Sequence, residues 1–146
     1  MVDRKPASLP DPGHRPSVMI VDDDAEMRAL LRDALERDGF DVREDSGGHL
    51  VPLLERRAPD AIVLDKEMAG VNGLDLLSYI RQRYPDLPVI VVTAFGGTEV
   101  EAEALRRGAT YYIDKPFRVA RLLGMLRAVL SQDTHGAGRR WAEYGR

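Results

Sequence analysis

The sequence predicts an α/β fold in which a doubly wound, five-stranded parallel sheet carries helices on both faces. Short apolar runs alternate along the chain with segments in which apolar residues recur every three or four positions, as they do in helices. The runs are continuously apolar, which is typical of parallel strands that are buried on both faces. The chain of 146 residues is long enough for one hydrophobic core. At this size a doubly wound open sheet is the commonest arrangement of alternating strands and helices.

Five apolar runs mark the expected strands. They cover residues 18–21, a weaker run at 40–42, and residues 61–64, 89–92 and 110–113. The helical stripes between and after them are formed by Met27, Leu30, Leu31, Ala34 and Leu35, by Leu50, Leu53 and Leu54, by Leu74, Leu77, Ile80 and Tyr84, by Val100, Ala104 and Leu105, and by Val119, Leu122, Leu123, Leu126, Val129 and Leu130. Gly39, Pro85 and Gly108 are expected to end the first, third and fourth helices. The chain therefore contains five β/α units.

Two flanking segments lie outside this pattern. Residues 1–16 contain four of the nine prolines and no periodic apolar pattern, so we expect a flexible, proline-rich N-terminal tail. Residues 132–146 are rich in glycine and arginine and are expected to form a C-terminal tail. The folded domain is therefore predicted at residues 17–131.

Composition restricts the class of partner. A net charge of −3 and a pI near 5.6 give no general attraction for nucleic acid or anionic membranes, so neither is an expected partner. The absence of cysteine excludes disulfides and thiolate catalysis, and a reducing cytoplasm is the natural compartment. The apolar runs are too short for a signal peptide or a membrane span.

Polar residues follow four of the five expected strands. They are Asp22, Asp23 and Asp24 after the first strand, Asp65 after the third, Thr93 after the fourth, and Asp114, Lys115 and Pro116 after the fifth. In doubly wound sheets, ligands bind beyond the carboxyl ends of the strands, so these side chains are expected to converge. The acids then form a pocket for a hard divalent cation, for which magnesium is the best fit because it prefers oxygen ligands.

A metal ion, a lysine and a hydroxyl around one carboxylate are the equipment for phosphoryl transfer. In that reaction, catalysis is mostly positioning and neutralisation of charge on the transferring group. A carboxylate can itself be the nucleophile and form an aspartyl phosphate. Asp65 is the best candidate because it stands alone at the end of a strand that others flank.

Four motifs in order closely resemble those of the receiver domain of bacterial response regulators, which belong to two-component signalling systems. They are IVDDD, VLDKEMAGVNG, VVTA and YYIDKPF, and the resemblance covers residues 17–131. It implies the flavodoxin-like (βα)5 fold, with strand order 2-1-3-4-5. One departure is Ala69, which stands where a proline commonly follows the methionine and is expected to leave this loop looser.

The resemblance also implies roles for individual residues. Asp22 and Asp23 match the acidic pair that holds magnesium, and Asp65 matches the phosphorylated aspartate, which is also a metal ligand. The backbone carbonyl of Glu67 is expected to complete the protein's metal ligands.

The remaining motif residues match positions that sense the phosphoryl group. Thr93 would hydrogen-bond to a phosphoryl oxygen, and Lys115 would pair with another. Pro116 matches a cis proline, and Tyr112 matches an aromatic residue that swings inward on activation. From strand alternation alone, either Tyr111 or Tyr112 could face the core.

These expectations add up to a stand-alone phosphoacceptor switch rather than an enzyme. A sensor histidine kinase or a phosphotransfer protein would donate the phosphoryl group to Asp65. A downstream protein would then recognise the face formed by the fourth helix, the fifth strand and the fifth helix. Because only about 15 residues follow Leu130, we expect no DNA-binding module after the domain.

Two other functions stay open at this stage. Asp22 and Asp24, one residue apart after a strand, resemble the nucleophile motif of haloacid-dehalogenase-type phosphatases. If the chain is a phosphoacceptor switch, we expect Asp24 to cap the first helix instead, because aspartate is a favoured N-cap. A third possibility is a degenerate receiver that acts only as a protein-binding module.

Overall fold

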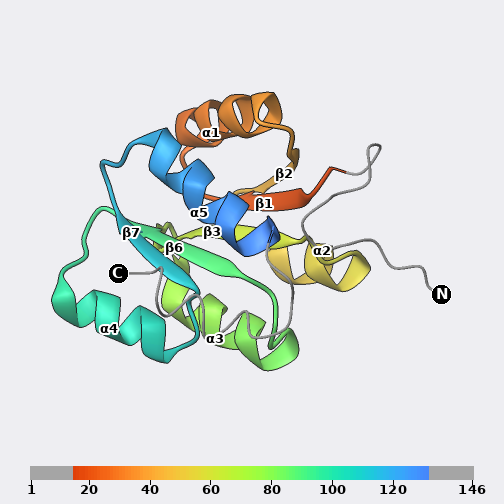
Figure 1. Ribbon diagram of the computed structural model, residues 1–146. Coiled ribbons are helices and arrows are strands. Elements are labelled where there is room, and N and C mark those ends of the chain that lie inside the picture. Colours follow the sequence, from red (N-terminus) through yellow and green to blue (C-terminus); the bar gives the residue numbers. More distant parts are fainter. Residues whose placement is uncertain (1–14, 132–146) are drawn as a thin grey trace.

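The computed structural model describes residues 15–131 and contains a five-stranded parallel sheet (Figure 1). Its strands are β1 (Ser17–Val21), β2 (Asp41–Asp45), β3 (Ala61–Asp65), β6 (Val89–Thr93) and β7 (Tyr111–Asp114). They lie in the order β2-β1-β3-β6-β7 and all pair in parallel. The predicted fold and strand order are therefore confirmed.

Helices cover both faces of this sheet (Figure 1). They are α1 (Ala25–Arg37), α2 (Leu50–Arg56), α3 (Gly73–Arg83), α4 (Thr98–Arg106) and α5 (Val119–Ser131). One core packs α1 and α5 against one face, and a second core packs α2, α3 and α4 against the other. The strand side chains alternate between the two cores: Val18 and Ile20 enter the first, and Met19 and Val21 enter the second. Burial on both faces explains why this strand is continuously apolar.

The register places the carboxyl ends of the strands close together. Val21 at the end of β1 pairs with Leu64 of β3, and the next residue of β3, Asp65, pairs with Val92 of β6. Thr93, which ends β6, pairs with Asp114 of β7. The polar residues at these strand ends therefore meet along one edge of the sheet, as the parallel pattern predicted.

Two details differ from the sequence-based expectation. The second strand lies at Asp41–Asp45 rather than 40–42, because it is an edge strand whose side chains are partly exposed and largely charged. A small antiparallel hairpin, β4 (Glu67–Met68) with β5 (Val71–Asn72), follows Asp65 and was not predicted. Strands of two residues are too short to produce a periodic pattern.

Most of the predicted tails, residues 1–14 and 132–146, lies outside the described residues. At the start of the described part, Arg15 donates hydrogen bonds to the backbone carbonyls of Glu36 and Phe40, at 3.1 and 3.2 Å. The carbonyl of Pro16 accepts the N–H of Asp41 at 2.8 Å. Within residues 15–131, no helix combines the length and the apolar character needed to cross a membrane.

Gly73 allows α3 to begin directly against the end of β3. A Cβ at this position would lie 2.6 Å from Lys66 Cα and 2.8 Å from the carbonyl oxygen of Asp65. These neighbours are backbone atoms, which cannot move aside as a flexible side chain can. The side chain of Asn72 caps the helix by accepting the N–H groups of Leu74 and Asp75. The start of α3 is therefore packed against the backbone that carries Asp65.

We expect Gly73→Ala to lower the free energy of unfolding by about 1–3 kcal/mol, because the added methyl group overpacks the end of β3. The matched control is Gly124→Ala on the exposed side of α5, where a Cβ meets nothing within 4 Å. That change should stabilise the protein by about 0.5–1 kcal/mol, because alanine favours a helix interior over glycine. Urea unfolding measures both values, and equal effects at the two glycines would contradict this packing.

Candidate functional site

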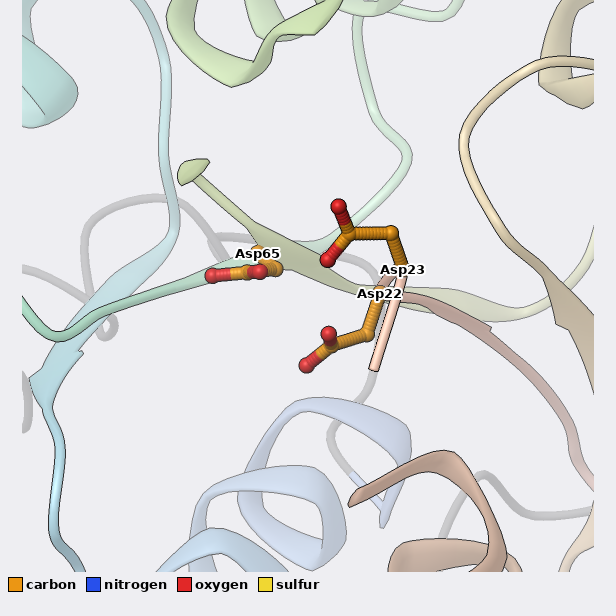
Figure 2. Close-up of side chains that lie close together, drawn as sticks. All are labelled: Asp22, Asp23 and Asp65. Carbon is orange, nitrogen blue, oxygen red and sulfur yellow. The ribbon is translucent and has the colours of Figure 1, made fainter. Parts of the chain in front are cut away.

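Three carboxylates converge at the carboxyl ends of β1 and β3. Asp22 and Asp23 directly follow β1, and Asp65 ends β3 (Figure 2). One oxygen from each side chain lies within 4.8 Å of the other two. Asp22 and Asp65 are each only 4 % exposed, whereas Asp23 is exposed. The structure therefore brings together the three side chains that the sequence predicted as metal ligands.

Backbone and arginine donors hold the acidic pair in place. The Asp22 side chain accepts the N–H of Asp24 at 2.9 Å, and its backbone carbonyl accepts a hydrogen bond from Arg28 at 2.6 Å. Asp23 accepts the N–H of Ala69 at 2.8 Å, from the turn between β4 and β5. A proline at position 69 has no N–H to donate. The departure from the family pattern thus gives the loop an added attachment to Asp23.

Asp24 serves the helix rather than the acidic cluster. Its side chain accepts the N–H groups of Glu26 and Met27, at 3.0 and 3.3 Å, and so caps α1. The N-cap interpretation of the third aspartate is confirmed. The resemblance to a phosphatase nucleophile motif loses support, because the second acid of that motif is used for capping.

Lys115 provides a positive charge between the two buried aspartates. Its Nζ lies 3.5 Å from Asp22 Oδ2 and 3.6 Å from Asp65 Oδ1. Burial opposes the charged form of this amine, but the neighbouring Asp65 and Asp22 carboxylates outweigh it and raise the pKa of Lys115. The Lys115–Pro116 peptide bond is cis, as the resemblance implied.

The surroundings of Asp65 change its pKa. Burial and the charge of Asp22 raise its pKa from an ordinary 3.8 to about 6. Lys115 and the N–H of Glu67 oppose this rise and favour the carboxylate. A carboxyl group with a pKa of about 6 is mostly ionised at pH 7. The ionised form is the one that can act as a nucleophile.

The charges of this cluster fit a divalent cation. Three carboxylates face one lysine, so two negative charges remain without a local partner when all three acids are ionised. All the side-chain ligands that the cluster offers are carboxylate oxygens, and no histidine belongs to it among the described residues. This donor set is suited to magnesium. The predicted fourth ligand, the backbone carbonyl of Glu67, belongs to the next segment, and its role stays a prediction.

Thr93 is fully buried at the end of β6 and is already hydrogen-bonded. Its hydroxyl donates to Glu67 Oε2, and the N–H of Ala94 donates to Glu67 Oε1 at 3.1 Å. Lys66 Nζ lies 3.0 Å from the same Oε2. Burial opposes ionisation of Glu67, but the bonds from Thr93, Lys66 and Ala94 lower its pKa. The sequence analysis predicted a metal-ligand role for the backbone carbonyl of Glu67, and it did not predict these hydrogen bonds of the side chain to Thr93 and Ala94.

Tyr112 lies inward beside the loop that follows Thr93. It is 7 % exposed, and its hydroxyl donates to Asp114 Oδ1 at 2.8 Å. Burial and this acceptor raise its pKa to about 12, so the phenol stays protonated. A Cβ at Gly96 would collide with the Tyr112 hydroxyl, so the close packing requires glycine there. Tyr111 is buried as well, in the core on the opposite face of the sheet. Both tyrosines therefore face a hydrophobic core, because helices cover both faces of the sheet.

Asp45 is a buried acid that the sequence analysis did not single out. It ends β2 and is 7 % exposed, and its Oδ2 accepts the N–H groups of Gly47 and His49, at 2.8 and 3.3 Å. An aspartate two residues before a glycine is a known turn signal, which could have identified it. Asp45 therefore shapes the turn before α2 and lies beside β1, because its carbonyl accepts the N–H of Asp22 at 3.1 Å.

Comparison with known proteins agrees with this geometry. Residues 18–127 match the family model of the response regulator receiver domain. The chain is 40 % identical over 110 residues to the response regulator protein FleR of Pseudomonas aeruginosa, covering 75 % of this chain and 23 % of FleR. It is 36 % identical over 124 residues to the response regulator MprA of Mycolicibacterium vanbaalenii, covering 83 % of this chain and 54 % of MprA. The chain thus spans between about a quarter and about half of these relatives' lengths.

Solved structures give the same result. The receiver domain of NtrX from Brucella abortus matches with a TM-score of 0.74 and 31 % identity, over 80 % of this chain and 99 % of that one. A response regulator from Thermotoga maritima matches with a TM-score of 0.73 and 31 % identity, over 82 % of this chain and all of that one.

The raised pKa of Asp65 predicts how stability depends on pH without metal. Because the pKa of about 6 in the folded state exceeds the ordinary 3.8, the folded protein binds more protons between these values and loses stability as pH rises through them. Asp65→Asn should therefore be more stable than the wild type at pH 7 in EDTA, by about 1–3 kcal/mol. The difference should shrink below pH 4.

Urea unfolding at several pH values measures this difference. Glu36→Gln, which removes an exposed carboxyl on α1, serves as the control and should change stability by about 0.5 kcal/mol or less. If Asp65→Asn were no more stable than the wild type at pH 7, Asp65 would not carry the electrostatic penalty described above.

Proposed function

Because this chain belongs to the response regulator receiver family, we propose that it is a phosphoacceptor switch in which Asp65 accepts a phosphoryl group. The observation that supports this proposal best is the arrangement around Asp65. The side chain is buried beside two further aspartates, and Lys115 contacts both Asp65 and Asp22. Receiver membership connects the chain to two-component signalling, and the arrangement supports Asp65 as the acid that we expect to be modified.

The proposed reaction transfers a phosphoryl group from a phosphohistidine. An Asp65 oxygen attacks phosphorus, the bond between phosphorus and the histidine nitrogen breaks, and the imidazole keeps the bonding electrons and takes up a proton. The donor would be a sensor histidine kinase or a phosphotransfer protein. The product stays attached to Asp65, so the chain acts as a switch and not as an enzyme that releases its product.

The chain's own residues prepare this transfer. Lys115 is close enough to Asp65 to pair with a phosphoryl oxygen, and Thr93 lies at the end of the neighbouring strand as a hydroxyl donor. Asp22, Asp23 and Asp65, with the carbonyl of Glu67, would hold magnesium. When bound there, this ion would neutralise negative charge on the phosphoryl oxygens.

The response would be read at the face formed by α4, β7 and α5. Phe95, in the loop before α4, is 73 % exposed, and Leu105 of α4 is 44 % exposed. They are two of the three large hydrophobic residues that are exposed in the described part of the chain. The same loop carries Gly96 against the Tyr112 hydroxyl, so movement of Thr93 would be passed to this surface. We propose a downstream protein as the partner.

Other partners are disfavoured by the composition. The net charge of −3 offers no general attraction to nucleic acid, so we propose no direct contact with it through this domain. A chain without cysteine needs no oxidising compartment, and we propose that it works in the cytoplasm.

Incubation with acetyl phosphate and Mg²⁺ should add one phosphoryl group to the wild type, measured by intact-protein mass. The Asp65 carboxylate displaces acetate from phosphorus in this reaction. Asp65→Asn should remain unmodified, because the amide is not a nucleophile of this kind. Asp24→Asn is the matched control: asparagine still caps α1, so labelling should match that of the wild type.

The three candidate functions give different results in this experiment. Labelling that survives Asp65→Asn would overturn the assignment of the acceptor. Turnover of acetyl phosphate that depends on Asp24 would indicate the phosphatase chemistry instead. If neither wild type nor variants were modified by acetyl phosphate, or bound beryllofluoride with Mg²⁺, the chain would be a binding module only.

A further inference from the structure

The side chain of Glu67 occupies both donors at the end of β6. One carboxylate oxygen accepts the Thr93 hydroxyl, and the other accepts the N–H of Ala94 at 3.1 Å. Lys66 pairs with the first oxygen at 3.0 Å. Three donors from two segments of the chain therefore converge on one negatively charged group. The Glu67 side chain is only 29 % exposed, so it is held against the protein rather than extended into water.

These donors lie next to the proposed acceptor. β6 is the direct neighbour of β3, and Asp65 pairs with Val92, the residue before Thr93. A phosphoryl group on Asp65 would present negatively charged oxygens at this edge, and such oxygens bind hydroxyl and N–H donors in the same way as a carboxylate. Glu67 and the phosphoryl group would then require the same two partners.

We propose that Glu67 is an internal anion that occupies the phosphoryl-binding groups of Thr93 and Ala94 and must leave them when Asp65 is phosphorylated. This inference rests on the proposed function and specifies how the site is regulated. Glu67 sets a threshold: phosphorylation replaces an existing set of hydrogen bonds instead of filling an open one. It also places a negative charge beside the incoming anion, which opposes its approach.

The same contact connects the site to the loop before α4. Thr93 Oγ1 accepts the N–H of Phe95, a residue of this loop, at 3.0 Å. The same hydroxyl donates to Glu67, so Thr93 links Glu67 to the loop. Further along this loop, Gly96 packs against the hydroxyl of the inward Tyr112. In this structure, Glu67 of β4 therefore holds Thr93, and through Thr93 the start of the loop before α4.

Two substitutions separate the parts of this role. Glu67→Ala removes both hydrogen bonds and the charge, whereas Glu67→Gln removes the charge but keeps the shape and one acceptor oxygen. Both leave the backbone carbonyl at position 67, so its proposed contribution to metal binding is retained. Glu99→Gln removes an exposed carboxylate charge in the first turn of α4 and is the matched control.

The probe is beryllofluoride with Mg²⁺, a stable mimic of the phosphoryl group, and its affinity is measured by calorimetry. We expect Glu67→Ala to bind it roughly three- to tenfold more tightly than the wild type, since no hydrogen bonds to Glu67 have to be broken. Glu67→Gln should show a smaller gain in the same direction, and Glu99→Gln should match the wild type. Labelling of Asp65 by acetyl phosphate should accelerate in the same order.

A second readout requires no phosphoryl mimic. In hydrogen exchange, the N–H groups of residues 94–97 should exchange faster in Glu67→Ala than in the wild type, because the loop loses its attachment to Glu67. Glu99→Gln should leave this exchange unchanged.

The outcomes separate this inference from the proposed function. If the wild type binds beryllofluoride and Glu67→Ala binds it equally or more weakly, the inference is overturned and the phosphoacceptor function stands. If the wild type neither binds the mimic nor is labelled, the proposed function fails and the inference fails with it. Should Glu67→Ala not fold, Glu67→Gln decides: tighter binding supports the inference, and equal or weaker binding overturns it.

Discussion

The repulsion among three aspartates at one edge of the sheet is the constraint on which the rest of the site depends. Asp22 and Asp65 are almost fully buried and Asp23 lies beside them, so their charges are less screened by water than those of surface acids. Lys115 compensates part of this charge. Burial and the charge of Asp22 raise the pKa of Asp65, and the uncompensated charge makes the cluster suited to a cation. The free energy of unfolding is therefore expected to be lower than it would be with a neutral side chain at position 65.

The surrounding residues fix the geometry of this unfavourable cluster without neutralising it. The N–H groups of Asp24 and Ala69 bind one acid each, and Arg28 binds the carbonyl of Asp22 rather than its carboxylate. Gly73 lets α3 begin against the end of β3. The carboxylates are therefore held in position by the backbone, and one oxygen of each lies close enough to the others to share a metal ion. This is the kind of preorganisation that phosphoryl transfer needs.

Much of the site could be predicted because it lies at strand ends. Apolar runs show where strands end, and parallel pairing brings those ends to one edge, so the convergence of Asp22, Asp65, Thr93 and Lys115 follows from simple rules. Helix capping by Asp24 was predictable for a similar reason, because it depends only on neighbouring residues.

What could not be predicted depends on contacts between distant segments. The direction of the Glu67 side chain is set by Thr93 and Ala94, which lie 26 and 27 positions further along the chain. The edge strand β2 carries charged residues because it is half exposed, so its sequence lacks a continuous apolar run. The close approach at Gly96 depends on Tyr112 from another strand. A local pattern contains no information about such pairs.

Calorimetric titration with Mg²⁺ at neutral pH, comparing the wild type with Asp23→Asn, tests most directly whether the clustered negative charge serves a cation. The account predicts one ion bound per chain in the wild type and a markedly weaker affinity in the variant, which loses one carboxylate charge but keeps the shape of the side chain. An affinity unchanged by this substitution, or no uptake by the wild type, would contradict it.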